Sequence, residues 1–320
     1  MKSLIIGPEA QNQRIDKFVR KYLSEAPLSF IYKLFRKKDV KINGHWVDAS
    51  YIVKVGDQLS IYVTDLQLKE FAKPKPVDKI AFNRQIIYED SHVLIVNKPS
   101  GLLVHGDENE KKVTLQNEVL SYLIQNGEYS TDMVGFTPAP AHRLDRNTSG
   151  LIIFAKDLPS LQVLEKLFKD KNDISKEYYA LVAGHTEEKG TIDLPLLKDE
   201  KAKTVKVSYK NGQVAKTVYQ TERHFHDSSL LRVNILTGRT HQIRVHMQAI
   251  DHPVIGDNKY GDFSINKKYA QLYGLKHQFL FARSLSFANV SSPLEYLSNR
   301  KFVCPWPEEE KIIIDKLTKE

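Results

Sequence analysis

The sequence predicts an α+β protein in which a small N-terminal module precedes a larger domain, built on a mixed, largely antiparallel sheet flanked by helices. Helical and strand-like hydrophobic patterns alternate irregularly, unlike the regular strand–helix repeat of parallel α/β folds. The proline-rich stretch KPKPVD, at residues 73–78, interrupts these patterns. We therefore expect a module over residues 12–70, a connector over 71–84, a main domain over 85–310 and a C-terminal tail over 311–320.

The N-terminal module is expected to contain two short helices and a small hairpin sheet. Apolar residues recur at helical spacing over residues 14–23, and a second helical pattern follows directly. The pair Asn43-Gly44 in VKINGHWV favours a tight hairpin turn, and QLSIYV predicts a further strand. Nine lysines and arginines against three acidic residues lie between residues 11 and 41, so most of the net charge of +8 belongs to this module.

The main domain shows a mixture of strand and helix patterns. Residues 86–98 read as two strands around a polar turn, and the apolar run LIIFA at 151–155 reads as a buried strand. Leucines at helical spacing predict a helix over residues 159–169. Further strand patterns occur in YYALVAG, VAKTVYQTER and LLRVNIL, so we expect this domain to be built on a sheet.

Composition narrows the functional classes. A pI near 9.2 favours a polyanionic partner. A single cysteine, Cys304, suits a reducing compartment, and no apolar stretch approaches the roughly 20 residues of a membrane span, so we expect a cytoplasmic protein without a membrane partner. No phosphate-binding glycine loop or CxxC pair occurs, and His241 and His246 are five apart without a nearby third ligand. We therefore expect chemistry without cofactor or metal.

The segment HRLDRNTSG, at residues 142–150, is the most informative one in the chain. It places Asp145 between two arginines, ahead of a polar turn and a buried strand, as expected of a catalytic loop. Taken alone, such an aspartate is more often a turn former or helix cap. Three further segments support the catalytic interpretation: NKPSGLLVHG (97–106), KEYYALV (176–182) and ILTGRTHQIRVHM (235–247).

In this order, the four segments resemble the motifs of the RluA-type pseudouridine synthases, which convert uridine in RNA into its C-glycoside isomer without a cofactor. The resemblance extends from about Arg14 to Phe302. In the N-terminal module, RIDKFV, IYKLFRKKDVKING and VGDQLSI resemble the S4 domain, a compact RNA-binding fold. Within the family the chain looks most like the RluC branch, bacterial enzymes that modify 23S ribosomal RNA. The resemblance implies that the partner is structured RNA, in particular 23S rRNA; we expect a monomer.

The resemblance also implies roles for individual residues. Asp145 is the expected catalytic carboxylate, and Tyr178 is expected to stack on the target base. Arg244 lies beside an apolar helical row where a bare charge is costly, so it needs a partner, which by resemblance is Asp145. Arg143 is expected to fill the gap left by the flipped nucleotide, and Thr240 to cap the helix carrying Arg244. Further substrate contacts are expected from Arg239, Gln242, Arg14, Arg36, Lys37 and Lys38.

Several alternatives stay open on sequence grounds. Tyr178 could also be an ordinary, half-buried aromatic residue of a strand. Arg143 could be a surface residue that contacts a phosphate. Lys37 and Lys38 could belong to a solvated cationic face. Asp145 could attack C1′ of the sugar or remove a proton from C2′. For the whole protein the alternatives are a non-catalytic RNA-binding ribosome-assembly factor, an N-glycosidase that releases uracil, and a synthase that acts on a different RNA.

Overall fold

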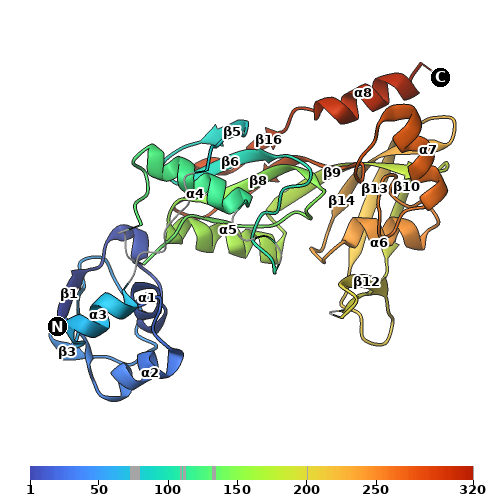
Figure 1. Cartoon of the computed structure of the whole chain (residues 1–320). Coiled ribbons are helices and arrows are strands. Elements are labelled where there is room, and N and C mark those ends of the chain that lie inside the picture. Colours follow the sequence, from blue (N-terminus) through green and yellow to red (C-terminus); the bar gives the residue numbers. More distant parts are fainter. Residues whose placement is uncertain (73–79, 109, 111–112, 132–134, 200, 320) are drawn as a thin grey trace.

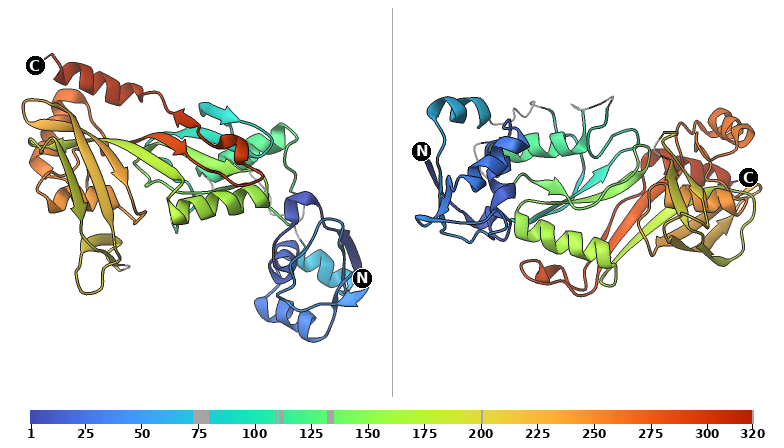
Figure 2. Two further views of the ribbon diagram at one scale, coloured as in Figure 1. Left: turned by 180° about the vertical axis from the view of Figure 1, so that it is seen from behind. Right: turned by 90° about the horizontal axis from the view of Figure 1, so that it is seen from below.

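The computed structural model describes residues 1–72, 80–108, 110, 113–131, 135–199 and 201–319. Within them, the N-terminal module lies at one end of an elongated molecule and a long sheet with its helices forms the rest (Figure 1). The views from behind and from below in Figure 2 show the same separation. The proline-rich stretch at 73–78 on which we based the connector lies outside the described residues.

The N-terminal module contains the two expected helices and the expected hairpin. Asn43 and Gly44 both adopt left-handed backbone conformations, with φ of 49° and 83°, as a two-residue hairpin turn requires. The four strands pair in the order β1-β4-β2-β3 around a core of their own. The elements of the module are β1 (Lys2–Ile5), the 3-10 helix η1 (Pro8–Ala10), α1 (Ile15–Tyr22), α2 (Leu28–Arg36), β2 (Val40–Ile42), β3 (His45–Trp46), β4 (Gln58–Ile61) and α3 (Asp65–Phe71).

The module is larger than the sequence suggested at both ends. Strand β1 pairs antiparallel with β4, so the sheet begins before residue 12. Helix α3, which the sequence did not reveal, ends one residue into the expected connector, and its Phe71 ring lies 4.9 Å from the ring of Phe30 on α2. None of the residues of α3 is fully buried, which explains its weak hydrophobic pattern. Its N-terminus is fixed instead by a reciprocal capping box between Thr64 and Gln67.

The module is attached to the main domain by polar contacts to backbone carbonyls. The side chains of Gln13 and Lys21 both donate to the carbonyl of Gly135, at 3.1 and 2.9 Å. From the other side, Gln162 on α5 (Leu158–Asp170) donates to the carbonyl of Asn12 at 2.9 Å. These contacts fix how the module sits beside the sheet.

The main sheet is mixed and almost entirely antiparallel, as expected. Its main path runs β10-β13-β14-β9-β15-β8-β6-β5, with β16 beside β15 and β7 beside β8. Among its named strands in the described part of the chain, only β8 and β15 pair in parallel. The strands are β5 (Ile86–Glu89), β6 (Val93–Lys98), β7 (Ala139–Pro140), β8 (Ser149–Ala155), β9 (Ile174–Ala183), β10 (Lys189–Asp193), β13 (Lys216–His224), β14 (Ser228–Ile235), β15 (Leu280–Phe287) and β16 (Lys301–Val303).

The half of the sheet nearer the N-terminal module is covered on both faces. Leu94 and Ile152 point toward helix α4 (Leu115–Gln125), which the sequence did not reveal, whereas Ile95 and Ile153 point toward α5. Successive residues of a strand face opposite sides, so both faces of β6 and β8 are buried. That burial explains why LIIFA is a continuous apolar run.

In the other half, α6 (Gln242–Ala249) covers one face of the sheet, and α7 (Phe263–Tyr273) and α8 (Glu308–Leu317) cover the other. Helix α8 contradicts the expected tail, because its Ile313 and Leu317 are buried with Tyr269 of α7. Only one side of α8 is apolar, and charged residues surround it, so its pattern in sequence is faint. A hairpin of β11 (Leu196–Asp199) and β12 (Thr204–Val207) and the 3-10 helix η2 (Glu295–Leu297) complete the domain.

Gly150 joins the two halves of the sheet at the end of the HRLDRNTSG segment. It pairs with Ala282 of β15, which in turn pairs with Tyr178 of β9. Its φ is +112°, and a Cβ at this position would lie 2.2 Å from the carbonyl oxygen of Ala282. Only glycine permits this approach. The close packing brings the loop that carries Asp145 next to the strand that carries Tyr178.

Candidate active site

The loop that carries Asp145 is held by the neighbouring loop of the NKPSG segment. The buried ammonium of Lys98 donates to the carbonyl of Arg146 at 2.9 Å and to two carbonyls of its own loop. Ser100 donates to the carbonyl of Asn147 at 3.0 Å, and the Arg146 side chain donates back to Gly101 at 3.0 Å. Together these bonds fix the backbone on the C-terminal side of Asp145.

Arg244 lies between two carboxylates. Its Nη1 donates to Oδ2 of Asp145 at 2.9 Å, which confirms the ion pair expected from the sequence. Its Nε and Nη2 form a second, two-pronged pair with Asp257, at 2.6 and 2.8 Å. Burial opposes the charge of the guanidinium, but the bonds and charge of Asp257, together with Asp145, raise the pKa of Arg244 above its usual value. The arginine therefore remains a cation and orients Asp145.

Asp257 is a site residue that sequence reasoning missed. Its side chain is 0% exposed, and it also accepts hydrogen bonds from the backbone nitrogens of Lys259 and Tyr260. Burial alone would raise the pKa of Asp257, but the bonds from Arg244 and from the backbone lower it. The Tyr260 ring supports the guanidinium of Arg244, whose Cζ lies 5.0 Å from the ring centroid. In sequence, an aspartate after glycine in IGDNKYG looks like an ordinary turn residue.

His241 is a second residue whose place was not foreseen. The hydroxyl of Tyr260 accepts a hydrogen bond from the backbone nitrogen of Val205, so its own proton is free to bond Nδ1 of His241, 2.8 Å away. Burial and Arg244 lower the pKa of His241 despite the opposing charge of Asp145, so the ring is neutral near pH 7. Because Nδ1 accepts the bond from Tyr260, the proton of the neutral ring is on Nε2. The Nε2 atom lies 3.9 Å from Oδ2 of Asp145.

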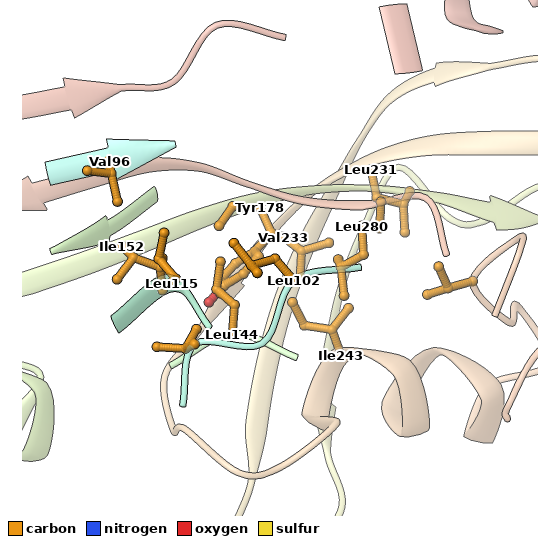
Figure 3. Close-up of a cluster of buried hydrophobic side chains, with 14 of the residues drawn as sticks. Val96, Leu102, Leu115, Leu144, Ile152, Tyr178, Leu231, Val233, Ile243 and Leu280 are labelled. Carbon is orange, nitrogen blue, oxygen red and sulfur yellow. The ribbon is translucent and has the colours of Figure 1, made fainter. Parts of the chain in front are cut away.

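Asp145 and Tyr178 line one pocket of about 110 Å³. Asp145 is the sole carboxylate that lines it within the described residues. Tyr178 is 4% exposed, and burial, followed by the charge of Asp145, raises its pKa, so the phenol is neutral. Figure 3 shows that Tyr178 belongs to the apolar cluster that also contains Leu144, Ile243 and Leu280. These apolar side chains form one wall of the pocket and favour an uncharged, flat group such as a nucleobase.

Two expectations for the ILTGRTHQIRVHM segment are wrong. Gln242 is 3% exposed and its amide is used internally: it donates to Lys216 and Thr217 and accepts from Thr237 and Arg239. It therefore shapes the pocket wall and has no amide group free to bind substrate.

Thr240 does not cap α6. The residue before this helix is His241, with φ of 53° and no side-chain cap bond. This left-handed conformation places the imidazole beside Asp145. His246, in contrast, is buried and hydrogen-bonded to Thr217 and to the carbonyl of Leu194.

The cationic residues expected to bind substrate fall into two groups. Arg143 and Arg239 are exposed and line the pocket. The other four lie in the N-terminal module, away from the pocket (Figure 1): Arg14, Arg36, Lys37 and Lys38. Arg14 is paired with Asp16 in an exposed fork.

Comparison with known proteins agrees with this geometry. A family model described as RNA pseudouridylate synthase matches residues 92–249. The chain is 35% identical to ribosomal large subunit pseudouridine synthase C of Vibrio cholerae, over 90% of this chain and 89% of the relative. It is 33% identical to the Escherichia coli protein of that name, with the same coverages. The solved structure of human RNA pseudouridylate synthase domain containing 4 superposes with a TM-score of 0.58 at 24% identity, covering 73% of this chain and 92% of the human one, so it supports the fold alone.

The fold and the site thus define an RNA-modifying enzyme built around one oriented carboxylate. The chain belongs to the RNA pseudouridine synthases, of the RluA/RluC type that the sequence motifs predicted. Across the described ranges, no group of three or more His, Cys, Asp or Glu side chains is arranged to hold a metal ion. In that same part of the chain, no helix combines the length and apolar character of a membrane span.

We expect Asp257→Asn to lower stability by about 3–5 kcal/mol, because it leaves the buried Arg244 with an incomplete set of partners. It should also lower turnover, because Arg244 can then turn away from its productive orientation toward Asp145. Urea unfolding monitored by circular dichroism measures the first effect.

Asp16→Asn is the matched control. It removes the same two-pronged arginine–aspartate contact, but on an exposed surface of α1, where solvent screens the pair. Equal stability losses in the two variants would contradict the importance assigned to the buried pair.

Proposed function

We propose that this enzyme isomerises specific uridines of bacterial 23S ribosomal RNA to pseudouridine. The observation that carries the proposal is Asp145, the single carboxylate that lines the pocket among the described residues, held by Arg244 against an apolar wall. The name of relatives at 33–36% identity, ribosomal large subunit pseudouridine synthase C, supports the large-subunit RNA as target.

The reaction breaks the bond from C1′ of the sugar to N1 of uracil, turns the base and joins C1′ to C5. In our proposal the Asp145 carboxylate begins it, either by attacking C1′ or by taking the C2′ proton. Arg244 holds the carboxylate in a fixed orientation in both cases. Glycosidases mostly use two carboxyl groups, one of which protonates the leaving group. A pocket lined by one carboxylate fits isomerisation, in which the base stays in the site.

Tyr178 and Arg143 receive roles in base handling. The buried, neutral phenol of Tyr178 offers an aromatic face on which the uracil can stack while it turns. The exposed Arg143, two residues before Asp145, is placed to enter the RNA stack when the uridine leaves it. Base flipping costs on the order of a few kcal/mol, which such an inserted side chain partly offsets. The apolar wall limits access of water that would otherwise hydrolyse the sugar intermediate.

The N-terminal module, from β1 to α3, is proposed to be an S4-type RNA-binding domain, joined to a catalytic domain that includes α8. Its surface carries exposed Arg36, Lys37 and Lys38, and Lys38 lies over the ring of Trp46 at 4.5 Å. Such a cationic and aromatic surface suits phosphate contacts and base stacking. We further propose that the enzyme acts as a monomer in the cytoplasm, without a cofactor.

Asp145→Asn is expected to lower the isomerisation rate by about 10³-fold or more, because the amide is neither a nucleophile nor a base. RNA affinity should stay near the wild-type value. Nucleoside analysis of a 23S RNA transcript after incubation measures the rate, with Asp315→Asn on the surface of α8 as a control of unchanged activity.

The products also separate the alternatives. Pseudouridine at unchanged RNA mass supports the proposal, abasic sites indicate an N-glycosidase, and unaltered RNA that is nevertheless bound indicates an assembly factor. Normal turnover by Asp145→Asn would contradict the proposed mechanism.

Deletion of residues 1–75 should weaken binding to 23S RNA and reduce its dependence on salt. Each lost phosphate contact lowers the slope of log affinity against log salt by about 0.7–0.9. Filter binding at several salt concentrations measures this slope. If the truncated protein binds the RNA as tightly as the full chain at every salt concentration, the module does not have the role proposed here.

A further inference from the structure

Three cationic side chains gather on one side of the catalytic pocket. Lys176, at the start of β9, and Arg239, in the turn before α6, both line the pocket that contains Asp145. Lys171 ends α5 in a left-handed conformation, with φ of 61°. A Cβ built on Gly238 would lie 3.0 Å from the Lys171 ammonium, so this group packs against the same turn. Three separate segments thus bring positive charge to one place.

Within the part of the chain that the structure describes, the two lysines of this cluster have no anionic partner. The Lys171 ammonium is buried and donates no hydrogen bond to any group in the described part of the chain. The Lys176 ammonium lies over the ring of Phe168 at 5.2 Å, and no carboxylate among the described residues pairs with it. Lys98 and Lys156 show the contrast, because the first is bonded to three carbonyls and the second to two carboxylates.

The electrostatics of the cluster favour an added anion. Burial, and then the charge of Arg239, lower the pKa of Lys171 to about 8. Burial, and then the charge of Lys171, lower the pKa of Lys176 to about 7. The cations therefore destabilise one another in the free protein, and an anion bound between them would relieve that repulsion.

The place of the cluster indicates which anion it serves. A uridine whose base lies against Tyr178 and whose sugar lies at Asp145 keeps its phosphodiester links at the rim of the pocket. A phosphodiester carries one negative charge and unesterified oxygens that ammonium groups bind.

We propose that Lys171 and Lys176, together with Arg239, bind a phosphodiester group that flanks the flipped uridine. The inference rests on the proposed function and deepens it, because it assigns the backbone contact that holds the target nucleotide while its base turns. Lys171 and Lys176 are thus substrate-binding residues, and neither takes part in bond breaking.

Lys171→Met and Lys176→Met test this assignment, because methionine keeps the apolar stem but not the charge. Each variant should bind a 23S RNA fragment about tenfold more weakly, the effect of losing a charged hydrogen bond, and its salt slope should fall by about 0.7. The melting temperature should be unchanged or higher, because a partnerless buried charge is removed. Lys311 on α8 is an exposed lysine away from the pocket, so Lys311→Met should change neither the RNA affinity nor the salt slope.

The wild-type enzyme gives an independent test with RNA that carries a neutral methylphosphonate beside the target uridine. At one flanking position this change should weaken wild-type binding about tenfold but have little further effect on the two lysine variants. Equal weakening of wild type and variants at every position, or unchanged affinity of both variants for ordinary RNA, would overturn the assignment. If wild type binds but does not isomerise ordinary RNA, the proposed function fails instead, and the salt slopes still report on the phosphate site.

Discussion

The ionic bridge from Asp257 through Arg244 to Asp145 is the interaction on which the site depends. A carboxylate at the wall of an apolar pocket is useful to the proposed reaction only when it is correctly turned, and the guanidinium of Arg244 holds Asp145 in place through a charged hydrogen bond. Arg244 is itself buried beside an apolar helix face, so it requires the fully buried Asp257 to hold its charge. The position of Asp145 therefore depends on Asp257 as well as on Arg244.

The fold assembles this bridge from segments distant in sequence. Asp145 precedes β8, Arg244 lies on α6, and Asp257 follows the turn after α6. The bare backbone of Gly150 lets β8 approach β15, and β15 in turn holds the strand of Tyr178 in register. The pocket is also lined by cationic side chains from other segments, among them Arg143, Lys176 and Arg239. An apolar wall with cations beside it suits a nucleotide, which has a flat base and a charged backbone.

Much of this architecture could be predicted from the sequence. The buried strands around LIIFA and the Asn43-Gly44 hairpin have strong local signals, and the pairing of Arg244 with Asp145 followed from the motifs. Helices α3 and α8 were missed because they bury little or one-sided apolar surface. Asp257, His241 and the internal role of Gln242 depend on tertiary contacts that leave no trace in local spacing.

The most direct test of the account is pseudouridine mapping of 23S ribosomal RNA from cells that lack this protein, complemented by the wild type or by Asp145→Asn. The account predicts that discrete pseudouridines disappear in the deletion strain and return with the wild-type protein alone. An unchanged map in the deletion strain would contradict 23S RNA as the target, and full restoration by Asp145→Asn would contradict the central role of the carboxylate.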